Sequence, residues 1–142
     1  MRAKQVSVFL ENKLGRLHEV AHILGDAAIN ISAFTVADTS DFGVVRLIVS
    51  DPDKACAVLK ENHFSVRSTD VVLVNSPNSP GALSFLLQIL NQEEIFIEYL
   101  YAFSMNDDHA VFVIRPTDID KCVERLQRHK NELSGSSGHY RM

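Results

Sequence analysis

The sequence lacks any run of apolar residues long enough to cross a bilayer, which takes about 20. Residues 1–10 alternate polar with apolar side chains and so do not form the core of a signal peptide. A surplus of basic charge is also absent, because 14 Lys and Arg stand against 18 Asp and Glu, for a net charge of −4. We therefore expect a cytoplasmic protein that binds neither membranes nor nucleic acid.

Cysteine is scarce, and several familiar catalytic patterns are missing. Cys56 and Cys122 each fall among the apolar positions of an expected helix, which favours buried thiols; a disulfide or a reactive thiol remains the alternative. No glycine-rich phosphate loop, nucleophile elbow or defensible pair of carboxylates is present. We expect no cofactor, no catalytic residues and no enzymatic activity.

What the sequence does contain is a repeat. The segments 12–17 and 29–31 return as 78–83 and 95–97, each pair 66 positions apart. The same offset joins apolar residues of strands and helices, including Val45 with Val111 and Ile48 with Ile114. A duplicated unit of about 66 residues without insertions explains this. The predicted domains are residues 1–69 and 70–142.

Hydrophobic periodicity assigns the elements of both copies. Alternation indicates strands, spacings of three and four indicate helices, and Pro52 suits a first helical position. The first copy has strands at 4–10, 29–37, 44–49 and near 65–69, with a hairpin loop at 38–43 and helices opening at Gly15 and Pro52. The second copy has strands at 71–75, 95–103 and 110–114, a hairpin tip at 107–109, and helices at 81–90 and 117–129.

The order β-α-β-β-α-β predicts an α+β fold of two ferredoxin-like units, with antiparallel sheets packed side by side and helices on one face. Segment 65–75 must end one unit and begin the next. The second copy lacks its last strand, unless residues 139–142 supply it, and the tail at 134–142 has a flexible composition. The edge at 71–75 would then expose unpaired backbone groups, which favours a homodimer.

The repeated loop is the best candidate binding site. Gly15 and Gly81 each stand where a strand passes into a helix, which permits a sharp turn and close approach of a ligand to free helix N–H groups. A carboxylate is the natural occupant. Asn12, Asn30 and Asn78 can both donate and accept hydrogen bonds. The alternative is a plain turn in which Asn bonds its own backbone.

These residues resemble the motif of the ACT domain, Asn-x-Pro-Gly-x-Leu followed by Ile-Asn-Ile. The second copy has Asn78, Pro80, Gly81 and Leu83 but carries Phe96 in place of the second Asn. The first copy keeps Asn30 but has Leu14 where Pro is usual. The whole chain resembles stand-alone tandem ACT proteins of bacteria, which lack a catalytic domain.

The resemblance implies a non-catalytic sensor that holds a free L-amino acid at the interface between ACT units and regulates amino-acid metabolism. An amino-acid biosynthetic enzyme is a further candidate partner. The expected ligand-binding residues are Asn12, Leu14, Gly15, Arg16, Asn30, Ile31, Asn78, Pro80, Gly81, Ala82 and Phe96. No metal is expected among them.

Two other functions remain as alternatives. An ACT-type module could serve dimerisation or docking without any ligand. The segment His18-Glu19-Val20-Ala21-His22 also spells the zinc-protease pattern H-E-x-x-H on a helix. Catalytic zinc needs a third protein ligand and a cleft, and no convincing third ligand is present. A zinc site at His18 and His22 is therefore the least favoured reading.

Overall fold

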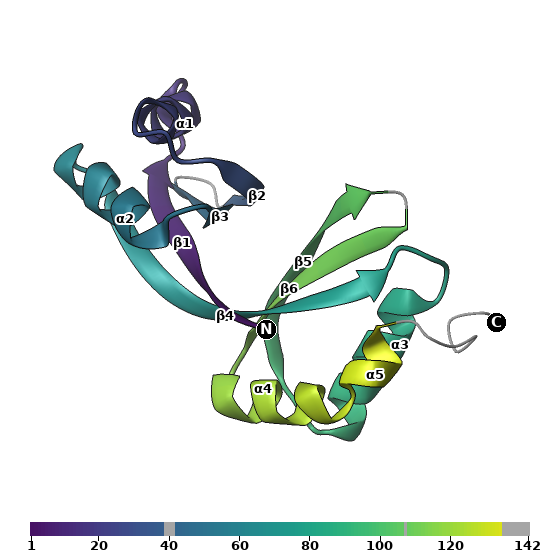
Figure 1. Ribbon diagram of the computed structural model, residues 1–142. Coiled ribbons are helices and arrows are strands. Elements are labelled where there is room, and N and C mark those ends of the chain that lie inside the picture. The colour runs from purple at the N-terminus through teal and green to yellow at the C-terminus, as the bar shows by residue number, and fades with distance from the viewer. Residues whose placement is uncertain (39–41, 107, 135–142) are drawn as a thin grey trace. The chain divides into compact units, whose positions relative to one another are not determined.

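The computed structural model of the chain describes residues 1–38, 42–106 and 108–134 (Figure 1). The chain divides into two compact units. The N-terminal unit comprises residues 4–69, and the C-terminal unit comprises residues 70–142 together with residues 1–3. The sequence places residues 1–3 in the first unit, whereas their contacts group them with the second.

The N-terminal unit has the predicted β-α-β-β-α-β order. Its strands follow the order β2-β3-β1-β4, with β3 antiparallel to both β1 and β2. Asp51 caps the second helix by accepting a hydrogen bond from the Lys54 N–H at 3.1 Å. The elements are β1 (Arg2–Glu11), α1 (Arg16–Asp26), β2 (Ile31–Asp38), β3 (Phe42–Val49), α2 (Pro52–Glu61) and the first part of β4 (Ser65–Pro77).

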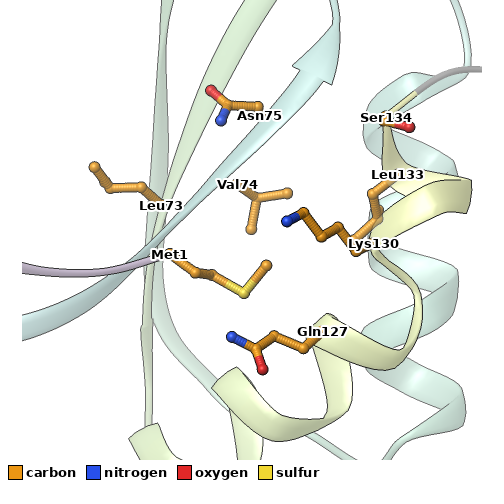
Figure 2. A pocket seen from close by; sticks show the side chains of 8 residues that line it. All are labelled: Met1, Leu73, Val74, Asn75, Gln127, Lys130, Leu133 and Ser134. Carbon is orange, nitrogen blue, oxygen red and sulfur yellow. The ribbon is translucent and has the colours of Figure 1, made fainter.

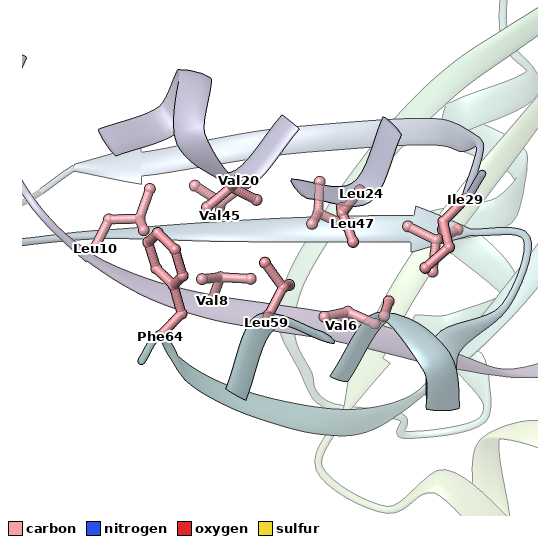
Figure 3. Packing of buried hydrophobic residues seen from close by; sticks show 12 residues of the cluster. Val6, Val8, Leu10, Val20, Leu24, Ile29, Val45, Leu47, Leu59 and Phe64 are labelled. Carbon is pink, nitrogen blue, oxygen red and sulfur yellow. The ribbon is translucent and has the colours of Figure 1, made fainter. Parts of the chain in front are cut away.

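One apolar core holds this unit together, between the helices and one face of the strands (Figure 3). Alternate residues of β1 face the helices because side chains of a strand alternate between its two faces. Val6, Val8 and Leu10 therefore pack with Val20 and Leu24 of α1. The core continues through Ile29, Val45, Leu47, Val49, Ala55, Leu59 and Phe64.

The C-terminal unit repeats this plan around the second part of β4. Strand β6 (His109–Pro116) pairs antiparallel with β4 and with β5 (Ile97–Asn106). Its helices are α3 (Ala82–Gln92), α4 (Ile119–Arg128) and the short α5 (Lys130–Leu133). The core contains Val72, Val74, Leu86, Ile89, Leu90, Ile95, Phe112, Ile114, Cys122, Leu126 and Leu133.

The predicted fold class is confirmed in both units: α+β, ferredoxin-like and antiparallel. The side-by-side arrangement of the units stays a prediction. None of the helices in the described part of the chain is long and apolar enough to cross a membrane. The predicted loop at 38–43 and hairpin tip at 107–109 lie partly outside the described residues, at 39–41 and 107.

The repeat is not free of insertions, which corrects the sequence prediction. Val8 pairs with Val45 in the first unit, whereas Val74, its equivalent, pairs with Phe112 in the second. The offset is therefore 66 through β5 and 67 from β6 onward. The register of β5 against β6 shifts between Ser104 and Asn106, which accommodates the extra residue.

Residues 1–3 lie at the edge of β4 where the C-terminal unit would have its fourth strand, and α5 follows α4 in the chain instead of that strand. The Leu73 N–H donates to the Met1 carbonyl oxygen at 2.6 Å, and Arg2 forms ion pairs with Asp70 and Asp120. Ser134, the first residue of the predicted tail, donates its N–H to the Lys130 carbonyl oxygen and its hydroxyl to the Asn131 carbonyl oxygen. Residues 139–142 lie outside the described part of the chain.

A charged network fixes the junction between α4 and α5. His129 Nε2 lies 2.8 Å from Glu93 Oε2, and its Nδ1 lies 3.2 Å from Glu132 Oε1. Arg125 also donates to Glu93. The hydrogen bond with Glu93 raises the pKa of His129, and the same bond lowers the pKa of Glu93.

This network predicts a pH dependence of stability. A raised pKa in the folded state means that charged His129 stabilises the protein below about pH 6.5, its usual unfolded pKa, and loses this contribution as pH rises through the folded pKa. In thermal unfolding, His129→Gln should therefore lower the midpoint more at pH 6 than at pH 9. The control is His22→Gln, because the His22 pair with Asp26 is exposed on α1. Equal losses at both pH values would contradict the assignment.

Candidate functional site

Two loops of the same backbone conformation connect a strand to a helix, one in each unit. Gly15 precedes α1 and Gly81 precedes α3, and both adopt φ 88° and ψ −10°. This left-handed conformation is costly for residues with a Cβ atom, so glycine is the residue that fits. The agreement of the two loops shows that Leu14, standing where the motif has Pro, does not alter the turn.

The hydrogen bonds of the two loops also correspond. Arg16 N–H donates to the Lys13 carbonyl at 3.3 Å, and Ala82 N–H donates to the Ser79 carbonyl at 3.2 Å. Glu19 N–H then begins the helical ladder by donating to Gly15. The N–H groups of the first helical turn have no intrahelical acceptors, which makes each loop a place where an anion is stabilised.

A small cavity of about 150 Å³ lies beside the first loop. Its wall combines the end of β1 with the start of α1, and its back is apolar. Asn12 and Arg16, both predicted site residues, line this cavity together. The other lining residues are Leu10, Glu11, Lys13, Leu17, Val36, Gly43 and Val45.

Both signs of charge border this cavity. Lys13 Nζ lies 2.7 Å from Glu11 Oε2, and this hydrogen bond lowers the pKa of Glu11. Arg16 Nη1 donates to Glu19 at 2.9 Å, and its guanidinium lies 4.4 Å from the ring centroid of Phe64. The Arg16 Nε is buried and has no hydrogen-bond partner within the described residues.

The second loop has the complete sequence motif but no charged side chain at the matching positions. Pro77 and Ala82 stand where the first loop has Glu11 and Arg16, by the offset of 66. Ala82 is buried, and Asn78 donates its N–H to the Asp108 carbonyl at 3.0 Å. The two loops are thus alike in backbone and different in electrostatics.

None of the other predicted residues lines the small cavity. In the N-terminal unit, Asn30 lies at the other end of the sheet from the first loop, because β1 reaches the loop opposite Phe42 whereas Asn30 is bonded to Ser50, at the far end of β3. Leu14 is fully exposed, at 105%, and Phe96 is 74% exposed. Asn30 is also exposed; its N–H donates to the Ser50 hydroxyl, and its carbonyl accepts from the Ser50 N–H, each at 3.0 Å. Thr117 N–H donates to the Phe96 carbonyl in the same way.

Sequence reasoning missed three contributors to the cavity region. Glu11 and Lys13 flank the motif residue Asn12, so their position beside the loop was a usable signal. Phe64 gave no such signal, because it lies 48 positions after Arg16 and reaches it through the packing of α2 and the following turn.

A second hollow of the N-terminal unit is almost wholly apolar. It has a volume of about 370 Å³ and lies between α1 and strands β2 and β3. Ile31, a predicted site residue, lines this groove and not the small cavity. The other lining residues are Leu17, His18, Val20, Ala21, Phe34 and Leu47.

The alternative chemistries of the sequence receive little support. The His18 and His22 rings lie 5.9 Å apart on α1, but no group of three or more potential metal-binding side chains occurs among the described residues. Cys56 and Cys122 are free thiols. Burial raises the pKa of Cys56 and raises that of Cys122 to about 11, which disfavours a reactive thiolate.

Comparison with models of known protein families identifies the family of this chain. The family model described as the ACT domain pair matches residues 1–135. The chain belongs to the ACT domain pair family. Among curated proteins, no match to this chain is found.

Solved structures share the fold of this ACT domain pair. Protein BT0572 from Bacteroides thetaiotaomicron is 54% identical, with a TM-score of 0.87 over 92% of this chain and 90% of that chain. The regulatory subunit of aspartate kinase from Thermus flavus is 13% identical, with a TM-score of 0.65 over 94% and 95% of the two chains. The corresponding subunit from Thermus thermophilus, in a ligand-free form, is 11% identical with a TM-score of 0.62, over 90% and 96%. At these low identities the kinase subunits show the fold alone.

The two glycines of the first ACT helix region should respond oppositely to the same substitution. Gly15→Ala should lower the free energy of unfolding by about 1–2 kcal/mol, because a Cβ is strained at a left-handed residue. Gly25→Ala should raise it by about 0.4–1 kcal/mol, since Gly25 is helical and a Cβ there meets nothing within 4 Å. Urea denaturation measures both values. An unchanged or higher free energy of unfolding in Gly15→Ala would contradict backbone strain at Gly15, and a lower one in Gly25→Ala would contradict the gain expected at Gly25.

Proposed function

We propose that this ACT domain pair is a non-catalytic sensor that binds a free L-amino acid at its first strand-to-helix loop and regulates amino-acid metabolism. One observation carries the proposal. The cavity beside the first loop combines the start of α1, a guanidinium and a carboxylate within one small, partly apolar space. A free amino acid carries the complementary pair of charged groups on a single Cα atom.

The α-carboxylate is assigned to the start of α1. The first-turn N–H groups and the helix dipole favour an anion there. Arg16 adds a charged donor, and its buried Nε lacks a partner that a carboxylate oxygen would supply. Stacking on Phe64 holds the guanidinium in place and limits the rotamer entropy lost on binding.

The α-ammonium is assigned to Glu11 and Asn12. The lowered pKa of Glu11 keeps its carboxylate ionised, and the Asn12 amide oxygen is a further acceptor. Lys13 would exchange part of its contact with Glu11 for the ligand. A volume of about 150 Å³ suits the main-chain groups of a small amino acid.

The first loop is proposed as the principal site, although the second has the fuller motif. Both loops offer the same backbone N–H groups, so the difference between them rests on charge. Hydrogen bonds to charged partners stabilise a complex by about 1.5–3 kcal/mol each. The second loop, with Pro77 and Ala82, has no equivalent of this contribution.

A regulatory role is supported by the solved structures that share this fold. Two of the similar structures are regulatory subunits of aspartate kinase, and E. coli aspartokinase III, 16% identical with a TM-score of 0.56, was solved in complex with lysine and aspartate. We extend this to the present chain as a proposal: amino-acid binding modulates an amino-acid biosynthetic enzyme. The burial of Cys122 and the incomplete H-E-x-x-H site favour the absence of catalysis.

A thermal-shift screen of the twenty amino acids tests the binding proposal. One small L-amino acid should stabilise the protein by about 2.7 kcal/mol at a hundredfold excess over Kd, because it binds the folded state alone. The D-enantiomer should do much less. Flat melting curves for all twenty at millimolar concentration would remove the sensor function.

Substitutions test whether the amino acid binds at the first loop. Arg16→Gln should lower the affinity for the amino acid that stabilises the protein most in the screen by at least about tenfold, since a charged hydrogen bond is lost. Arg67→Gln is the matched control, because Arg67 lies in the same unit with its guanidinium 5.9 Å from the Phe9 ring and outside the cavity. Circular dichroism checks that both fold. Unchanged affinity in Arg16→Gln would move the site away from the first loop.

A second candidate function is homodimerisation through the apolar groove of α1 and β2. Strand β2 is at the edge of its sheet, and Phe34 is 63% exposed beside the groove. An exposed edge strand next to an apolar groove marks a surface for association. A second copy of the chain would cover both.

Sedimentation at micromolar concentration tests the dimer. The expected species has twice the 15.9 kDa mass of one chain. Phe34→Glu should raise the dimer dissociation constant at least about tenfold, because a charge would be buried unpaired. Ala102→Glu, at an exposed position of β5 that corresponds to Val36 of β2, is the control. A monomer with and without amino acid would exclude dimerisation while leaving the sensor proposal standing.

A further inference from the structure

A second cavity lies wholly within the C-terminal unit, away from both loops. It has a volume of about 330 Å³ and opens between β4 and helices α4 and α5 (Figure 2). This is the size of pocket that holds a small organic ligand. Nothing in the amino-acid sensor function uses it.

The cavity has a structural origin. In the N-terminal unit, a fourth strand follows α2 directly and lies next to β1. In the C-terminal unit α5 follows α4 instead, and the place beside β4 is taken at Leu73 by Met1. Because successive residues of a strand point their backbone groups to opposite edges, Asn75 presents its N–H and carbonyl to the same edge as Leu73. The hollow lies beside this stretch of β4.

The lining combines the Lys130 ammonium with polar and apolar side chains. Val74 and Leu133 are buried and form opposite walls, and the Met1 thioether lies between β4 and Gln127 (Figure 2). The Lys130 ammonium extends from α5 into the space facing Val74 (Figure 2). Of the residues that line the cavity, Lys130 is the one with an ionisable side chain.

The polar groups at this cavity are available to a ligand. Neither the Lys130 ammonium nor the Gln127 amide has a hydrogen-bond partner among the described residues. The side chains of Leu73 and Asn75 point away from the space between β4 and α5 (Figure 2), so these residues offer backbone groups to it. A cation, an amide and strand-edge donors beside the apolar Met1, Val74 and Leu133 match a carboxylate with an aliphatic body.

We propose that this cavity, between β4, α4 and α5, is a binding site for a small branched aliphatic carboxylate, with Lys130 as its charge partner. The carboxylate lies against Lys130 and the Gln127 amide, and the aliphatic part contacts Val74, Leu133 and Met1. An amino acid is disfavoured here, because its ammonium would face Lys130 with no acidic side chain in the lining. The site is therefore chemically distinct from the loop at Gly15.

The test is a titration of the ¹⁵N-labelled full chain with 3-methylbutanoate. We expect saturable shifts of the amides of Val74, Asn75, Leu133 and Ser134, with a Kd of about 1 mM or tighter. The neutral analogue 3-methylbutanamide, which has the same shape, should bind at least about tenfold more weakly because it lacks the charge-assisted hydrogen bond.

Matched variants test whether the carboxylate binds at Lys130 and Gln127. Lys130→Gln should lower the affinity for 3-methylbutanoate at least about tenfold, and Gln127→Phe should block the cavity. Both residues are exposed, so the fold should survive. Lys60→Gln, near the end of α2 in the other unit, is the control and should stay within about twofold of wild type.

Three results would overturn the proposal: no saturable shift, equal affinity for acid and amide, or unchanged affinity in Lys130→Gln. Shifts confined to residues 11–17 would likewise overturn it, by showing that the carboxylate uses the loop at Gly15. The sensor proposal fails separately, because amino-acid binding depends on Arg16 and should be unaffected by Lys130→Gln.

Discussion

Each unit depends on a central strand that is hydrogen-bonded along both of its edges. In the N-terminal unit, β1 lies between β3 and β4. In the C-terminal unit, β4 has β6 on one edge and residues 1–3 on the other, through Leu73 and Met1. Unpaired strand edges are costly when buried and prone to association when exposed. Because the described residues after α4 contain no strand, the C-terminal unit pairs the other edge of β4 with residues 1–3, and β4 itself serves both units.

The two strand-to-helix loops share a backbone conformation but differ in the charge of their side chains. Gly15 and Gly81 have the same dihedral angles, so the helix N–H groups are presented alike. Glu11 and Arg16 then distinguish the first loop from the second, where Pro77 and Ala82 stand. Duplication thus preserved the turn, which only glycine fits, while the charged side chains around it were free to differ.

The sequence predicted most elements, and its errors have physical causes. The glycine turns, the helix faces and the continuity of segment 65–75 follow from local patterns. The inserted residue escaped notice because Val111, Phe112, Val113 and Ile114 are all buried, so both faces of β6 are apolar and alternation cannot fix its register. The short α5 was missed because its four residues form less helix than periodicity can detect.

The sequence by itself determined the duplicated fold, the two left-handed glycines and the candidate loop residues, because these rest on short-range periodicity and turn chemistry. The tertiary structure decided which segment completes the C-terminal unit, that Phe64 supports Arg16, and that a cavity opens beside Lys130. Each of these joins residues that are far apart in the chain, such as Met1 with Leu73. Such contacts follow from the packing of whole elements, which no local pattern encodes.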